Sequence, residues 1–134
     1  MTCFWDGILR SLDPNDFLFA MRRKTKPNKT EFIHWLKNAN SSPIDIYWNN
    51  KRLTQQEQIE HKEAIGCYKV SDIRAGHMCS SCDSFLLLIA QLFQVTIQHS
   101  YMNNLITYTN IKNSRKTLRF VSNSTHFQCI RRRR

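Results

Sequence analysis

Cys3 is the first residue of the sequence that could do chemistry, and it stands directly before a segment of helical character from Phe4 to Leu12. Cysteine attacks as the thiolate, and the N-terminus of a helix lowers the pKa of a thiol because the helix dipole favours the anion. The same residue could also be a buried apolar side chain or a metal ligand. A nucleophilic role requires an imidazole within hydrogen-bond reach, so the histidines bear on the choice.

The sequence contains five histidines, and spacing alone does not select a partner for Cys3. His34 lies among apolar residues of a predicted helix, His61 in a polar predicted helix and His99 in a predicted strand, so these three suit structural or surface roles. His126 stands in the stretch Ser-Thr-His-Phe-Gln near the end of the chain, where no structural role is as evident. His126 is therefore the candidate base of a Cys–His pair.

A second group of candidate ligands lies within sixteen residues and consists of Cys67, His77, Cys79 and Cys82. Structural zinc sites usually combine two paired half-sites, whereas this group has a single CxxC pair. The interval from Cys67 to His77 is not a usual paired spacing, and Cys82 opens the most apolar predicted helix, where cysteine is an ordinary core residue. We predict that the protein binds no metal and no cofactor. If it does bind a metal ion, these four residues are the candidate ligands.

The chain of 134 residues carries a formal net charge of +10. Much of this charge is concentrated in a basic segment that follows two phenylalanines and in the terminal run of arginines. Such a balance attracts polyanions, which include nucleic acid, an anionic membrane and an acidic protein face. The sequence shows no recognisable nucleic-acid-binding motif. The polyanion-binding candidates are Arg22, Arg23, Lys24, Arg131, Arg132, Arg133 and Arg134.

The hydrophobic pattern predicts an α+β domain. The pattern of apolar residues predicts helices over residues 4–12, 16–21, 31–39 and 82–93, and a polar composition rich in Gln and Glu predicts a surface helix over residues 51–64. Strand-like stretches cover residues 44–48, 95–101, 105–111, 118–121 and 125–130. Thr30 is the expected N-cap of the third helix, and Asn103 and Asn104 the expected hairpin turn. The helices come first and an antiparallel meander comes late, in one domain over residues 1–130 followed by a basic Arg tail, residues 131–134.

Composition excludes several classes of protein. Hydrophobic residues make up 41% of the chain, which excludes wholesale disorder, and no apolar run approaches the roughly 18 residues of a membrane span. The number of cysteines is odd and no secretory signal is visible, so we expect a reduced, intracellular setting. The predicted core consists of Phe4, Ile8, Leu12, Trp35, Leu86, Ile89, Leu92, Phe93, Val95, Ile97, Ile106 and Phe120.

Three blocks of sequence carry a resemblance to a known family. They are TCFWDGILRSL, AGHMCSSCDSFLLLIAQLFQVTIQHSYMNNLITYTN and LRFVSNSTHFQCI. The first is a cysteine followed by an aromatic residue at the head of a helix. The second is a Gly-containing loop, an apolar helix, a strand, a turn and a strand, and the third is a strand, a polar loop and a His-aromatic-polar triplet. In this order the blocks resemble the OTU (ovarian tumour) family of cysteine peptidases, many of which are deubiquitinases, and they cover about half of the chain.

The resemblance assigns the site residue by residue. Cys3 falls on the nucleophile of the family and His126 on its general base. Gln128 falls where the family usually has Asn or Asp, and its carboxamide oxygen can accept the imidazole N–H and fix the tautomer. The backbone N–H groups of Cys3 and Phe4 fall where an oxyanion site would form. The family's further acid, three positions before its cysteine, and its Asp-Gly-Asn lead-in have no counterpart in these residues.

The resemblance implies an OTU-like cysteine peptidase fold, a small antiparallel sheet packed between helices. It implies cleavage of isopeptide bonds to ubiquitin or a ubiquitin-like protein by a Cys–His mechanism, inside a cell. The alternative is a catalytically degenerate OTU-like protein, which would be a basic structural or virion component that binds nucleic acid or another acidic partner through its basic loop and tail. A compact version of the fold rich in Asn and Lys indicates a large DNA virus or another parasite as the source.

Overall fold

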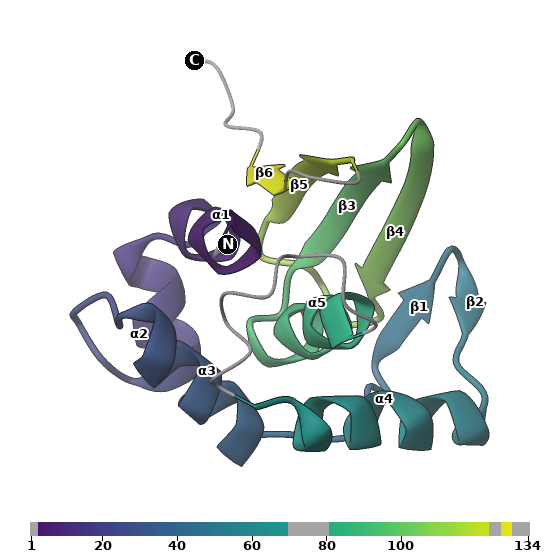
Figure 1. Cartoon of the computed structure of the whole chain (residues 1–134), viewed down its shortest axis with the longest axis horizontal. Helices are drawn as coiled ribbons and strands as arrows, with labels where there is room; N and C mark the ends of the chain where they lie inside the picture. Colours follow the sequence, from purple (N-terminus) through teal and green to yellow (C-terminus); the bar gives the residue numbers. More distant parts are fainter. Residues whose placement is uncertain (1–2, 70–80, 124–126, 130–134) are drawn as a thin grey trace.

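The structure is a computed structural model that describes residues 3–69, 81–123 and 127–129 (Figure 1), without the side chains of Cys3, Ser81 and Gln128. The helices are α1 (Cys3–Ser11), α2 (Pro14–Met21), α3 (Lys29–Asn38), α4 (Gln55–Cys67) and α5 (Ser81–Leu92). The strands are β1 (Ile46–Trp48), β2 (Lys51–Arg52), β3 (Thr96–Tyr101), β4 (Asn104–Asn110), β5 (Thr117–Ser122) and β6 (Phe127–Cys129). The predicted α+β class is confirmed.

The six strands form one mixed sheet in the order β2-β1-β4-β3-β5-β6. Every neighbouring pair is antiparallel except β3 and β5, which run parallel, so the predicted antiparallel meander is wrong. The cause lies in the segment that joins β4 to β5, residues 111–116, which we call the return segment. The Arg115 N–H donates to the Gln94 carbonyl at 2.9 Å, and the Thr96 N–H donates to the Lys116 carbonyl at 3.1 Å. These bonds hold the start of β5 beside the start of β3.

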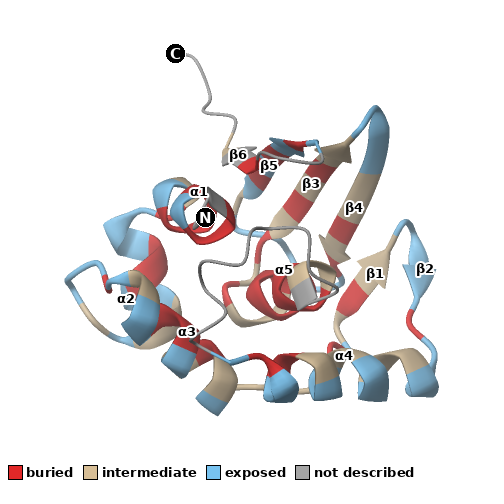
Figure 2. Ribbon diagram, in the orientation of Figure 1, coloured by how far each residue is buried: buried red, intermediate tan, exposed pale blue. Residues whose placement is uncertain are grey.

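The helices lie against one face of the sheet (Figure 1). Successive strand residues point to opposite faces, so Ile97, Leu118 and Phe120 are buried under the helices. Arg119 and Val121 alternate with them and are exposed, as Figure 2 shows for β5. Among residues 3–69, 81–123 and 127–129, no helix covers this opposite face. The prediction of a sheet packed between helices is therefore wrong for the described part of the chain.

Capping explains where the helices begin. The Asn28 side chain accepts from the Glu31 N–H at 2.8 Å and the Glu31 side chain accepts from the Asn28 N–H at 3.0 Å, which is a reciprocal capping box. Thr30, the predicted N-cap, is instead inside α3. Thr54 and Glu57 form the same box at α4, so that helix begins at Gln55 and not at residue 51.

The β3–β4 turn is a tight hairpin. Met102 and Asn103 both have positive φ, 47° and 70°, which is the pattern of a type I′ turn. The turn therefore lies one residue earlier than the predicted pair Asn103 and Asn104.

The core is mostly the predicted one. Nine of the twelve predicted residues are buried, whereas Trp35, Leu92 and Ile106 are only partly buried. The prediction missed seven buried aromatic residues: Trp5, Phe17, Phe32, Tyr68, Phe85, Tyr108 and Phe127. Several of these rings meet edge to face, which fixes the helices around α1. No described helix is long and apolar enough to cross a membrane.

Candidate active site

Helix α1 is held in one orientation by the two aromatic residues behind Cys3. Trp5 is buried, its ring lies 4.8 Å from that of Phe85, and its indole N–H donates to the Tyr68 hydroxyl at 3.1 Å. Phe4 is buried against the other neighbour of the helix, where its ring centroid lies 4.8 Å from that of Phe127. Two anchors on different sides prevent rotation of α1, so its first turn has a fixed position.

The neighbour that Phe4 contacts is β6, which begins directly after the candidate base in the sequence and contains the candidate orienting group. Phe127 is 3% exposed and stacks on Phe120 at a centroid distance of 4.9 Å. His126 immediately precedes Phe127, and Gln128 immediately follows it. The structure thus brings together the first turn of α1 and the strand that begins next to His126.

The structure does not describe the three predicted catalytic side chains themselves. Cys3 is the first residue of α1 and Gln128 is the middle residue of β6, but their side chains are not described, and His126 lies outside the described residues. The backbone N–H groups of Cys3 and Phe4 are the predicted oxyanion donors. The first four N–H groups of an α-helix have no acceptor within the helix, which makes them available to an anion.

Gly7 allows α1 and β6 to approach closely. A Cβ atom at this position would lie 2.8 Å from Cδ1 of Phe127 and 3.7 Å from the backbone nitrogen of Cys129. Real Cβ contacts below 3 Å essentially never occur, so a larger residue would require the buried Phe127 ring to shift, and with it the packing of β6 on the helix. The glycine therefore determines the distance between the two elements of the candidate site.

His99 is a second imidazole beside β6 that the sequence did not indicate as functional. It is 7% exposed, its Nε2 is 2.6 Å from the Ser122 hydroxyl oxygen, and its ring lies 5.3 Å from that of Phe127. Ser122 ends β5, the strand that precedes His126. Alternation with Ile97 could have placed His99 on the buried face, but only the parallel pairing of β3 and β5 brings it to Ser122. Its contacts link β3 to the end of β5 and to the first residue of β6.

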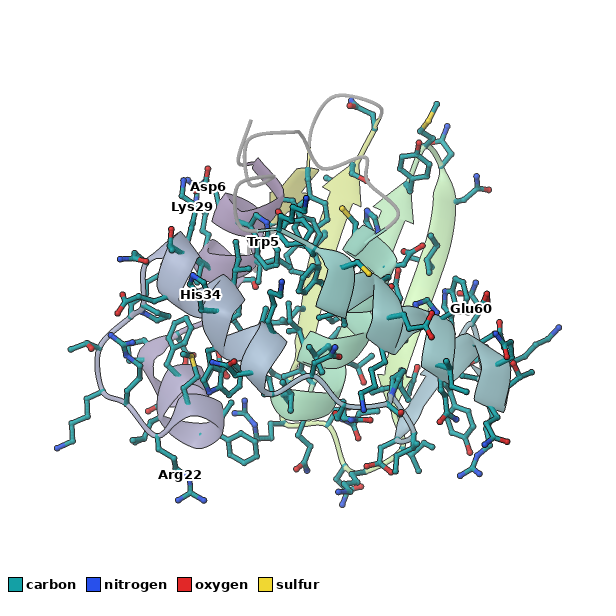
Figure 3. The ribbon with its side chains drawn as sticks, turned by 60° about the horizontal axis from the view of Figure 1, so that its bottom comes forward. Trp5, Asp6, Arg22, Lys29, His34 and Glu60 are labelled. Atoms are coloured by element: carbon teal, nitrogen blue, oxygen red, sulfur yellow. The ribbon has the colours of Figure 1, made fainter. Side chains whose placement is uncertain are left out.

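Asp6, in the first turn of α1, is an exposed acid that binds a cation. Its carboxylate lies 2.9 Å from the Lys29 ammonium, and Figure 3 shows the two side chains together. A negative charge in the first turn interacts favourably with the positive end of the helix dipole, and so it stabilises α1.

The candidate metal ligands are only partly described. Cys67 is exposed at the end of α4 and Cys82 is partly buried in the first turn of α5, while His77 and Cys79 lie outside the described residues. Within the described ranges, no group of three or more His, Cys, Asp or Glu side chains could hold a metal ion.

A polar network joins α4, α5 and β4 away from the candidate site. His61 Nδ1 lies 2.8 Å from the Ser84 hydroxyl, and the Tyr108 hydroxyl donates to Asp83 at 2.5 Å. Burial lowers the pKa of His61, while Asp83 opposes that shift, and burial together with Asp83 raises the pKa of Tyr108 well above its usual range. Ser84 is 2% exposed, so no substrate reaches this His–Ser pair and the network is structural.

The described polyanion-binding candidates lie at the end of α2. Arg22 is the left-handed C-cap of that helix and is exposed, as is Lys24. Arg23 forms an ion pair with Glu31 at 3.6 Å. The four terminal arginines lie outside the described residues.

No protein-family model, curated protein or solved structure matches the chain in the three comparisons made.

Proposed function

We propose that the chain is an OTU-like thiol peptidase that cleaves isopeptide bonds to ubiquitin or a ubiquitin-like protein. The observation that carries the proposal is the packing of α1 on β6, in which Phe4 and Phe127 are in contact. Cys3 precedes the first of these residues and His126 precedes the second, although they are more than a hundred positions apart in the sequence. A nucleophile and a base must come from such neighbouring segments.

In the proposed reaction the Cys3 thiolate attacks the carbonyl carbon of the isopeptide bond. His126 takes the thiol proton and gives it to the lysine amine as the C–N bond breaks, which leaves a thioester on Cys3. Water, deprotonated by the same imidazole, then hydrolyses the thioester and restores the thiol. Gln128 accepts the other ring N–H, and the N–H groups of Cys3 and Phe4 donate to the oxyanion.

The surrounding structure supports these roles. The helix dipole favours the thiolate at the start of α1, and the two anchors Phe4 and Trp5 keep that start in place. The exposed, free thiol of Cys67 is consistent with the reduced, intracellular setting that a cysteine nucleophile needs.

The proposal is tested with ubiquitin, or a ubiquitin-like protein, that carries a C-terminal electrophile. We expect the wild-type protein to gain the mass of one such molecule, and the Cys3→Ala variant to gain none. Cys67→Ala is the matched control, because it removes an exposed thiol from a different helix, and it should react like the wild type. If folded wild-type protein forms no adduct with any of these probes, or if Cys3→Ala still forms one, the peptidase proposal is wrong and the non-enzymatic alternative gains support.

Gly7→Ala is expected to slow adduct formation about 10²-fold with a small loss of stability. The new Cβ would meet a buried ring that also stacks on Phe120, so β6 must move relative to α1. Overpacking costs about 1–3 kcal/mol, and the better helix propensity of alanine offsets about 1 kcal/mol of it. The reaction rate therefore reports the displacement, and urea unfolding reports the stability.

Gly66→Ala is the matched control for this substitution. Gly66 lies in α4, and its added Cβ would have one neighbour, Asn40 Nδ2 at an ordinary 3.9 Å. This variant should gain stability and react at the wild-type rate. A wild-type rate for Gly7→Ala would show that the spacing of α1 and β6 does not matter to the chemistry.

A further inference from the structure

Helix α2 exposes two large apolar side chains that its neighbours cover only in part. Leu18 is 46% exposed and Phe19 is 44% exposed, whereas Phe17 is fully buried. The Arg22 N–H donates to the Leu18 carbonyl at 3.2 Å, so Arg22 stands one turn further along the same side of the helix. An apolar pair and a cation thus share the outer side of α2.

The loop that follows adds uncompensated positive charge. Residues 21–29 contain five Lys and Arg and no acid, and two of these cations have carboxylate partners: Arg23 with Glu31, and Lys29 with Asp6. The other three are Arg22, Lys24 and Lys26, all exposed. We name Leu18, Phe19, Arg22, Lys24 and Lys26 the basic-apolar tip.

No described carboxylate lies within salt-bridge distance of the three cations of the tip. The nearby acids of α2 are occupied, because Asp16 binds Arg115 and Lys116, and Asp13 binds Lys116. The exposed acids Asp6, Asp13 and Glu31 are ion-paired with other cations. The two other exposed acids of the described residues, Glu60 and Glu63, are on α4, which lies away from the end of α2 in Figure 1. Figure 3 shows Arg22 and Glu60 pointing outward at different ends of the molecule. The tip is therefore the part of the described surface that is best suited to contact a negatively charged partner.

One contact and one exposed side chain favour a lipid surface over nucleic acid as the occupant. Nucleic-acid-binding surfaces offer free aromatic faces to the bases, but the Arg115 guanidinium lies over the Phe19 ring at 4.1 Å. Leu18 has no π system, and its exposure next to cations contributes nothing to phosphate recognition. Apolar side chains flanked by Lys and Arg are typical of the headgroup region of a bilayer.

We propose that the basic-apolar tip binds the surface of an anionic membrane. Leu18 and Phe19 enter the boundary between headgroups and acyl chains, and Arg22, Lys24 and Lys26 contact the lipid phosphates. Each cation contributes about a fivefold gain in affinity at a phosphatidylserine-containing surface, so the three together contribute about 10²-fold. Binding is expected to be reversible and salt-sensitive, and it does not depend on peptidase activity.

Co-sedimentation with vesicles tests the proposal, using phosphatidylcholine with or without phosphatidylserine. We expect the wild-type chain to bind only the phosphatidylserine vesicles. The triple variant Arg22→Asn, Lys24→Gln, Lys26→Gln should lose about 10²-fold in affinity, and Asn suits the left-handed backbone at position 22. Leu18→Ser should weaken binding to the same vesicles about tenfold without disturbing the Phe19 contact.

The matched control removes the same charge from another part of the surface. The variant Lys51→Gln, Arg52→Gln, Lys62→Gln changes three exposed cations on β2 and α4. It should bind phosphatidylserine vesicles within about twofold of the wild type, with circular dichroism confirming the fold of every variant. Equal losses in both triple variants, wild-type binding by Leu18→Ser, or absence of wild-type binding would overturn the proposal. If the tip triple instead loses binding to a single-stranded oligonucleotide and not to vesicles, the tip is a nucleic-acid site.

Discussion

Replacement of His126 by alanine is expected to lower kcat for cleavage of a ubiquitin isopeptide substrate about 10²- to 10⁴-fold. The reason is that the thiol of Cys3 loses the base that takes its proton, and the leaving amine loses its proton donor. The groups that bind the body of the substrate are unchanged, so KM should change little. Steady-state kinetics on a fluorogenic substrate measures both constants, with the kcat of the Cys3→Ala variant as the baseline.

Two other histidines show whether this loss is specific. His34 is exposed on α3, as Figure 3 shows, and His34→Ala should leave kcat unchanged. His99→Ala removes the contact with Ser122 and should lower both stability and kcat, because His99 positions the strand that precedes His126. If His126→Ala retains kcat within about twofold while His99→Ala abolishes it in a folded protein, His99 is the base and the assignment is wrong.

Local patterns in the sequence were sufficient to predict the elements. Apolar spacing located four of the helices, because amphipathic periodicity reflects burial of one face, and polar composition located α4. The predicted extended segments match every described strand except β2. The two-residue strand β2 has no such pattern and was missed. The start of α3 was placed at Thr30, since a β-hydroxyl suits an N-cap, but Asn28 with Glu31 three residues later provides a reciprocal box.

The arrangement of the strands depends on contacts that no local pattern encodes. An antiparallel β3–β4 hairpin could be inferred from its turn. The parallel pairing of β3 with β5 depends on the return segment, where Arg115 and Lys116 bind the backbone near the start of β3 and the carboxylate of Asp16. Asp16 stands about a hundred positions before Arg115 and Lys116 in the sequence, so only the folded chain shows these ion pairs.

The kinds of residue in the candidate site could be predicted from the sequence, but the segments that lie next to each other there could not. The sequence provided a thiol before a helix and a histidine near the end, and the resemblance paired them. The closeness of α1 and β6 rests on Gly7 and on the contact of Phe4 with Phe127, neither of which the sequence marked. The sequence suits His99 to a structural role because a histidine in a strand has no distinctive signal, and its contact with Ser122 is visible only in the folded chain.

Replacement of Asp16 by alanine is expected to destabilise the fold by about 3–5 kcal/mol, since it breaks a buried ion pair by removing one partner. The Asp16 side chain is 1% exposed. One of its oxygens accepts from Arg115 at 2.9 Å, and the other accepts from Lys116 and from the Asp13 N–H, both at 2.8 Å. Without the carboxylate, α2 loses its attachment to the segment between β4 and β5, and Arg115 remains partly buried without its counter-charge.

Urea unfolding of the purified variant measures this change in the free energy of unfolding. Asp13→Ala is the matched control, because the Asp13 side chain is 54% exposed and binds the same Lys116. It removes an N-cap and a surface ion pair, and should cost about 1 kcal/mol. A cost for Asp16→Ala no larger than that of Asp13→Ala would show that the buried carboxylate does not hold α2 to the sheet. The parallel β3–β5 arrangement would then depend on the backbone hydrogen bonds of the return segment alone.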